Sequence, residues 1–166
     1  MAVILVTGAS GFIGRGLSAE LAGRHDVIAM SRNDPGLDLP WVKGEFFAWE
    51  DLRRLDGRGI DVAVHLAAVL ANVHEREQMR VNVEGTRCLM RYLIDNGCRK
   101  FVTASSIAAV GIQDIRFRPL RLPVPDDHPC LDRSGYGFSK FMMEEVTRYC
   151  QRQDEEVDIV NLRLSS

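Results

Sequence analysis

The chain has 166 residues, of which 46% are hydrophobic and 27% are charged. This length predicts one domain, and the apolar fraction excludes an intrinsically disordered chain. Lys and Arg total 21 against 23 Asp and Glu, and the resulting net charge of −2 argues against a nucleic-acid-binding surface, which would be basic and clustered. The apolar runs are too short for a membrane span, which needs about 18 residues.

The N-terminal residues, the cysteines and the histidines indicate which kinds of protein this chain could be. Met1–Val6 has no basic leader, so we expect no signal peptide and a cytoplasmic protein without membrane contact. The four cysteines form no C-x-x-C pair, and we expect plain thiols, some of them in the core. The histidines lack the H-x-x-x-H spacing of zinc ligands, so no metal site is expected.

The hydrophobic pattern predicts strands that alternate with helices. Short apolar runs indicate strands, and apolar residues three or four apart indicate helices. The expected strands are Ala2–Val6, Asp26–Met30, a short one within Trp41–Trp49, Asp61–Leu66, Lys100–Ser105 and Val157–Leu164. The expected helical segments are Phe12–Ala22, one or two turns in Glu50–Leu55, Glu75–Asp95 and Tyr136–Arg152. Between them, Ile107–Gly135 holds four prolines and no period, which is typical of a functional loop.

This alternation predicts an α/β fold in a single domain over residues 1–166. We expect a doubly wound, Rossmann-type parallel sheet of about six strands, in the order 3-2-1-4-5-6, with helices on both faces. The last strand, Val157–Leu164, is apolar enough to be covered on both faces. It would nevertheless lie at an open edge, where unpaired strands are a liability.

A glycine-rich segment, Thr7–Gly14, follows the first strand and opens the first helix. Gly8 would allow the tight turn, Gly11 would let the backbone approach a pyrophosphate, and Gly14 would let the helix pack closely on the strand. The helix N-terminus offers free N–H groups to phosphates. We therefore expect a dinucleotide to bind here, the alternative being a purely structural turn.

The residues that close the second strand bear on the choice of dinucleotide. An acidic residue there would hold the ribose 2′-hydroxyl of NAD, but the chain has Ser31 and Arg32. Serine can hydrogen-bond a phosphate, and arginine can neutralise one. This favours NADP slightly over NAD, unless Arg32 is only a solvated surface charge.

Tyr136 and Lys140 lie four residues apart at the start of a predicted helix and so share one face. A cation beside a tyrosine lowers its pKa towards the working pH, where proton transfer is efficient. Ser105-Ser106 ends the fifth strand, where open α/β sheets bind ligands. We expect Tyr136 to move a proton during hydride transfer; the alternative makes Tyr136 a packed aromatic and Lys140 a solvated charge.

Together these motifs resemble an extended short-chain dehydrogenase/reductase of the NAD-dependent epimerase/dehydratase family, over essentially the whole chain. Thr7–Gly14 resembles the family's T-G-x-x-G-F-I-G loop, and His65–Ala68 resembles its cofactor-lining H-L-A-A segment. Asn82–Thr86 is similar to the N-V-x-G-T helix motif, in which the Asn is structural. Ser105–Gly111 resembles the S-S-x-x-x-x-G segment, and Asn161–Arg163 resembles the N-L-R of the sixth strand.

The resemblance implies roles for individual residues. Ser106, Tyr136 and Lys140 match the catalytic set, and Lys140 would also hold the nicotinamide ribose. The expected cofactor-binding residues, from both lines of reasoning, are Gly8, Ser10, Gly11, Phe12, Ile13, Gly14, Ser31, Arg32, Glu45, Phe46, Leu66, Ala67, Ala68, Tyr136 and Lys140.

The chain departs from the family pattern in four places, one of which is Ser31-Arg32 in place of the acidic residue of the NAD-preferring members. Gly44-Glu45-Phe46 stands where the family often has Gly-Asp-Leu, whose Asp contacts adenine, and Val110 replaces a Tyr in the serine segment. Members also continue past N-L-R into a seventh strand and a substrate-binding region, which we expect to be missing from this chain. We therefore expect a fragment or truncated product, or a chain that protects its edge strand in an unusual way.

The function implied by the resemblance is that of an NAD(P)-dependent oxidoreductase, epimerase or dehydratase. The substrate would be a nucleotide sugar or another hydroxyl or carbonyl compound. The alternative is a non-catalytic NAD(P)-binding or redox-sensing module, against which the presence of Ser106, Tyr136 and Lys140 counts. The oligomeric state stays open, with a homodimer among the expected assemblies.

Overall fold

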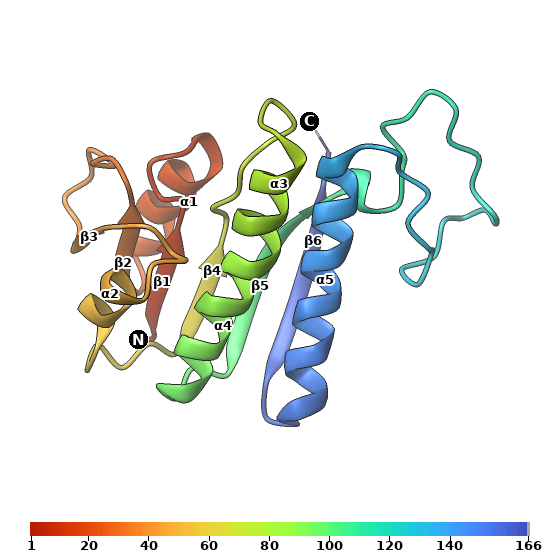
Figure 1. Cartoon of the computed structure of the whole chain (residues 1–166). Coiled ribbons are helices and arrows are strands. Elements are labelled where there is room, and N and C mark those ends of the chain that lie inside the picture. Colours follow the sequence, from red (N-terminus) through yellow and green to blue (C-terminus); the bar gives the residue numbers. More distant parts are fainter. Residues whose placement is uncertain (166) are drawn as a thin grey trace.

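The computed structural model describes residues 1–165. One parallel sheet has the order β3-β2-β1-β4-β5-β6, which confirms the predicted topology (Figure 1). The strands are β1 (Val3–Thr7), β2 (Asp26–Ser31), β3 (Trp41–Lys43), β4 (Val62–His65), β5 (Lys100–Ser106) and β6 (Asp158–Leu164). The helices are α1 (Phe12–Ala22), α2 (Trp49–Leu52), α3 (Glu75–Gln78), α4 (Thr86–Asp95) and α5 (Gly135–Gln153).

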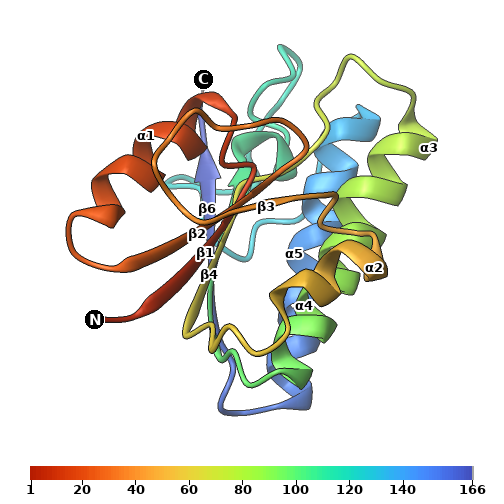
Figure 2. The ribbon, with the colours of Figure 1, turned by 90° about the vertical axis from the view of Figure 1, so that its left-hand side faces the viewer.

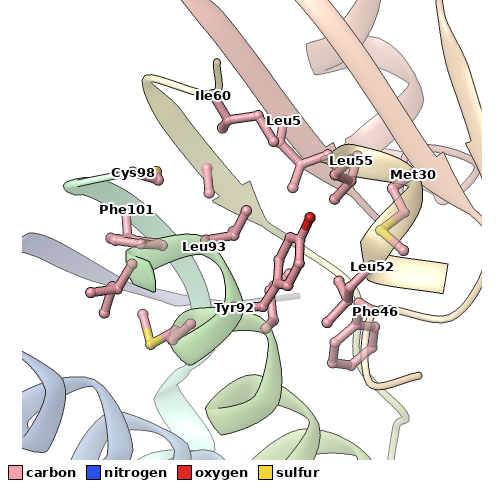
Figure 3. Close-up of a cluster of buried hydrophobic side chains, with 14 of the residues drawn as sticks. Leu5, Met30, Phe46, Leu52, Leu55, Ile60, Tyr92, Leu93, Cys98 and Phe101 are labelled. Atoms are coloured by element: carbon pink, nitrogen blue, oxygen red, sulfur yellow. The ribbon is translucent and has the colours of Figure 1, made fainter. Parts of the chain in front are cut away.

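Helices cover both faces of the sheet, but unequally. Figure 2 shows α1 on one face and α2, α4 and α5 on the other. The larger core lies on the second face, where Tyr92 and Leu93 of α4 pack among Leu5, Leu52 and Phe101 (Figure 3). A residue on β1 thus meets residues on β5, α2 and α4, so this core holds the two halves of the sheet together. Two of the cysteines, Cys98 and Cys150, are buried in it.

The predicted helix Glu75–Asp95 is helical throughout, but not α-helical throughout. A π-helical segment, Met79–Gly85, separates α3 from α4. Gly85 allows this wider turn to approach the segment between β3 and α2, because a Cβ there would lie 2.9 Å from Phe46 Cε2. The apolar period changes little over so short a segment, so the pattern could not reveal it. Such segments are frequent at functional sites.

Two apolar features are more exposed than the pattern predicts. Phe12 belongs to the predicted apolar stripe of α1, yet its side chain is 101% exposed at the start of the helix. Strand β6 lies at the sheet edge as expected, and Ile159 is buried against the helices. On the opposite face Val160 and Leu162 are 48% and 46% exposed, so this face of β6 is partly uncovered in the described chain, although the strand is apolar enough for cover on both faces.

Over residues 1–165, none of the helices combines the length and the apolar character that crossing a membrane requires.

Candidate active site

The glycine loop joins β1 to α1 by packing backbone directly on backbone. Gly8 has φ +72°, and a Cβ there would lie 2.8 Å from the amide nitrogen of Ala67. A Cβ on Gly14 would lie 2.2 Å from the carbonyl oxygen of Gly8. The loop therefore fits tightly between the ends of β1 and β4, and the N-cap of α1 is a glycine, Gly11. This is the cradle that a phosphate group needs.

A cavity of about 250 Å³ opens beside this loop, over the carboxyl ends of β1, β2 and β4. Most of the predicted cofactor-binding residues line it, but Phe12, Ile13 and Gly14 of α1 do not. The predicted residues that line the cavity are Gly8, Ser10, Gly11, Ser31, Arg32, Glu45, Phe46, Leu66, Ala67 and Ala68. The structure thus brings together residues from four separate segments of the chain.

Two polar side chains, Ser31 and Arg32, lie at the end of β2 on the rim of the cavity. The Ser31 hydroxyl is hydrogen-bonded within the protein, and the Arg32 side chain is exposed to solvent. Ser31 is buried, and its hydroxyl donates to the carbonyl oxygen of Asn33 at 2.7 Å. Trp41 Nε1 in turn donates to the carbonyl oxygen of Ser31 at 3.3 Å. Ser31 therefore shapes the turn, while the exposed Arg32 presents the charge of this rim to the cavity.

Arg80 also lines the cavity, although it lies in a charged stretch of the predicted helix Glu75–Asp95 whose composition is typical of a solvated helix face. Its guanidinium binds Glu77 through two hydrogen bonds of 2.9 and 2.7 Å. The same guanidinium lies 4.6 Å from the centroid of the Phe47 ring, in a cation–π contact. The i,i+3 spacing of Glu77 and Arg80 is visible in the sequence. Their position at the cavity is not, because it depends on Phe47, more than thirty residues earlier in the chain.

A buried histidine ties the floor of the cavity together. His65 Nδ1 lies 2.7 Å from Thr7 Oγ1, and His65 Nε2 lies 3.0 Å from Thr86 Oγ1. Thr86 donates its own proton to the carbonyl oxygen of Asn82, so it accepts from His65 Nε2–H, and Nδ1 accepts from Thr7. Burial, with the nearby charge of Lys140, lowers the pKa of His65 to about 3. The neutral ring thus links β1, β4 and α4.

Ser106 and Tyr136 meet where β5 ends and α5 begins. Ser106 Oγ accepts from the amide of Ala108 at 3.1 Å, which starts a 3₁₀ turn. The first turn of α5 is capped by Ser134 Oγ, which accepts from Gly137 N at 3.0 Å. Burial raises the pKa of Tyr136, and a hydrogen bond with the Ser106 side chain acts in the opposite direction. The structure therefore places these two predicted residues near each other, at the end of β5 and the start of α5.

Lys140 follows one turn later on α5, with only 2% of its surface exposed. Its ammonium donates to the carbonyl oxygen of Ala104 on β5 and lies 3.5 Å from Met143 Sδ. Burial lowers its pKa to about 8, although the nearby Glu144 carboxylate acts to raise it. Its interpretation as a solvated charge is therefore wrong. Tyr136 and Lys140 form a separate cluster that does not line the cavity at the glycine loop.

In the part of the chain that the structure describes, residues 1–165, no group of three or more His, Cys, Asp or Glu side chains is placed to hold a metal ion. The parallel strand order and the phosphate-type cradle at the end of β1 define a Rossmann-type α/β domain. The chain belongs to the NAD dependent epimerase/dehydratase family, whose model matches residues 4–166.

Individual relatives agree with this assignment. The chain is 28% identical to a dTDP-4-dehydro-6-deoxyglucose reductase of Escherichia coli, over 98% of this chain and 55% of the relative. It is 29% identical to UDP-glucose 4-epimerase 4 of rice, Oryza sativa subsp. japonica, over 96% and 48%. The chain thus spans about half the length of these relatives.

Solved structures show the same architecture. A short-chain dehydrogenase/reductase superfamily protein from Agrobacterium tumefaciens with bound NAD superimposes with a TM-score of 0.84 at 32% identity, over 97% of this chain and 48% of that one. MoeE5 in complex with UDP-glucuronic acid and NAD gives a TM-score of 0.81 at 28% identity, over 98% and 54%.

Proposed function

We propose that the chain binds NAD(P) along the carboxyl edge of its sheet and takes part in hydride transfer on a nucleotide sugar, or on another substrate with a hydroxyl or carbonyl group. One observation carries the proposal: the glycine cradle after β1, Ser106 at the end of β5 and Tyr136 at the start of α5 belong to the same edge of one parallel sheet. A dinucleotide is an extended molecule that can reach from one to the other.

The cavity fits a dinucleotide in its chemistry. Gly8 and Gly11 leave room for a pyrophosphate at the N-terminus of α1, whose N–H groups would donate to it. Glu45 and Phe46 would contact the adenosine half, and Arg32 would receive a ribose 2′-phosphate. We retain the preference for NADP, because β2 ends without an acidic side chain. The NAD-bound relative from Agrobacterium supports a nicotinamide cofactor.

The proton would move through Tyr136. The bound nicotinamide supplies the chemistry of accepting or returning a hydride at the substrate carbon. Ser106 would hydrogen-bond the substrate oxygen, and Tyr136 would take or give its proton. Because burial raises the pKa of Tyr136, the positive charge of Lys140 is needed nearby to favour the phenolate. Nucleotide-sugar substrates are suggested by the UDP-glucuronic acid complex of MoeE5 and by the names of the sugar-nucleotide relatives.

Titration with NADPH and NADH, followed by turnover assays with nucleotide sugars and simple carbonyl compounds, tests the proposal. Tyr136→Phe should lower turnover by about 10²- to 10⁴-fold. Tyr149→Phe, an exposed tyrosine of the same helix, is the matched control. Absence of nucleotide binding would refute the proposal. Binding without Tyr136-dependent turnover, in a longer form of the chain as well as in this one, would favour the non-catalytic NAD(P)-binding module.

We propose further that residues 1–166 serve as the cofactor-binding domain of a longer enzyme, because the relatives are about twice as long. The half-exposed face of β6 fits a surface that further residues would cover. A homodimer and a cytoplasmic location remain predictions, which mass measurement in solution and cell fractionation would test.

A further inference from the structure

A second buried charge lies on α5 one turn beyond Lys140. Glu144 is 1% exposed, and both of its carboxylate oxygens are engaged. Oε1 accepts from Ser105 Oγ at 2.6 Å and from Arg163 Nε at 2.9 Å. Oε2 accepts from Arg163 Nη2 at 2.8 Å and from Arg148 Nη2 at 3.1 Å. Hydrogen bonds and the charge of Arg163 keep the pKa of this carboxyl below its ordinary value, so Glu144 stays ionised.

This carboxylate joins the elements that carry the proposed catalytic residues. Ser105 on β5 directly precedes Ser106, and Glu144 lies on the helix that carries Lys140. Arg163 comes from the edge strand β6, and its Nη2 also donates to the carbonyl oxygen of Asp126 at 2.9 Å, in the long loop between β5 and α5. Glu144 therefore connects two strands, one helix and this loop at a single buried point.

Stability alone is a weak explanation for this arrangement. Taking charges out of water is costly, and well-packed apolar side chains of similar volume often stabilise a fold equally well or better. A retained buried charge therefore needs another use. Here the next buried charge along the helix is the ammonium of Lys140, one turn earlier on the same face of α5, and the charge of Glu144 acts to raise its pKa.

The groups around Lys140 leave Glu144 as its anionic neighbour within the described chain. From β4, His65 is neutral near pH 7 because its pKa is about 3. Tyr136 of α5 is neutral there, because burial raises its pKa. Arg163 of β6 is cationic but is bound to Glu144. If the carboxylate were removed, burial would still disfavour the charged form of Lys140, and no neighbouring negative charge would offset this effect.

We propose that Glu144 is a positioning residue, which holds the end of β5 against α5 and keeps the buried Lys140 ammonium charged for its work at the nicotinamide ribose and Tyr136. The role of Lys140 at the ribose and Tyr136 rests on the proposed function. The effect of Glu144 on the charge of Lys140 does not. The distinction allows the two to be tested separately.

The direct experiment follows the titration of Lys140 in the cofactor-free protein by NMR of lysine side chains, with Lys140→Met to assign the signal. The wild-type midpoint should lie near pH 8. Glu144→Gln should lower it by about one pH unit, because an adjacent opposite charge is removed. Glu145→Gln makes the same charge change one residue later on a half-exposed side chain and should leave the midpoint unchanged.

Cofactor affinity is the functional readout. In the wild type it should fall as pH rises through about 8, and in Glu144→Gln the fall should begin about one unit lower. A Glu144→Leu, Arg163→Met double variant removes the charge pair but keeps the volume, so it should recover thermal stability and still show the lowered midpoint.

A Lys140 midpoint unchanged in Glu144→Gln, or one restored in the double variant, would overturn the inference and leave Glu144 a structural residue. A lowered midpoint in a protein that binds no cofactor would instead support the electrostatic inference and refute the proposed function.

Discussion

The two ends of the site are built from different materials. At β1 the chain uses backbone: Gly8 and Gly14 allow the loop, strand and helix to approach more closely than any side chain permits. At β5 it uses buried polar side chains, with Lys140 and Glu144 held inside the protein between a strand and a helix. The first end is fitted to bind phosphates by geometry, and the second to move a proton by controlled charge. The first should therefore fail through steric change and the second through change in pH.

The largest expected effect is steric. Gly14→Ala would place a Cβ 2.2 Å from the carbonyl oxygen of Gly8, and backbone at both positions leaves little room to adjust. We expect loss of measurable NAD(P)H binding and a clear drop in melting temperature. Gly16→Ala is the matched control, because a Cβ there meets nothing within 4 Å. It should retain binding and gain about 0.5–1 kcal/mol of stability. Equal behaviour of the two variants in fluorescence titration would contradict the cradle.

Acid should act next, through His65. The pKa of His65 is about 3 in the folded protein and 6.5 in the unfolded chain. Between these pH values His65 is therefore protonated in the unfolded chain and neutral in the folded protein. His65 makes its full contribution to the free energy of unfolding above pH 6.5. As the pH falls towards 3, this contribution of about 4–5 kcal/mol is lost. Urea unfolding across this range should show a shallower loss in His65→Asn than in His74→Asn, an exposed histidine. Parallel curves would show that His65 titrates normally.

Whereas acid destabilises the protein through His65, raising the pH above 8 should stabilise it through Lys140. Its folded pKa of about 8 lies below the usual lysine value near 10.4, so between these values the unfolded state holds more protons. The free energy of unfolding should therefore rise by about 2–3 kcal/mol between pH 8 and pH 10 from this group. Lys140→Met should lack that rise when both proteins are unfolded in urea. A rise of the same size in the variant would place its origin elsewhere.

The smallest expected effect concerns the choice of cofactor. Arg32→Ala should reduce affinity for NADPH about tenfold relative to NADH, a change of about 1.4 kcal/mol, because one exposed cation is removed from the rim. Arg58→Ala, an exposed arginine that does not line the cavity, should leave the ratio unchanged. An unaltered ratio in Arg32→Ala would mean that this side chain is only a solvated charge.

The sequence predicts the β1 end better than the β5 end for a physical reason. A glycine loop acts through residues next to one another, so Thr7–Gly14 and its strand–turn–helix context can be recognised locally. The strand order follows similarly from alternating apolar runs. The contact between Ser105 and Glu144 joins residues 39 positions apart, and no pattern within either element records it.

The apolar pattern also could not predict which side chains are exposed to solvent. Val160 and Leu162 fit a strand covered on both faces, but such a pattern does not say whether a neighbour is present. Similarly, Arg80 has the composition of a solvated helix face and gains its place at the cavity only from the packing of Phe47.

The most direct test of the central claim is the structure of the protein with bound NADPH. The pyrophosphate should lie at the N-terminus of α1 over Gly11, and the nicotinamide should lie beside Tyr136 and Lys140, with the Lys140 ammonium turned from the carbonyl oxygen of Ala104 towards the ribose. A cofactor bound with its nicotinamide away from Tyr136, or bound outside the cavity at the glycine loop, would contradict the claim that the two ends form one site.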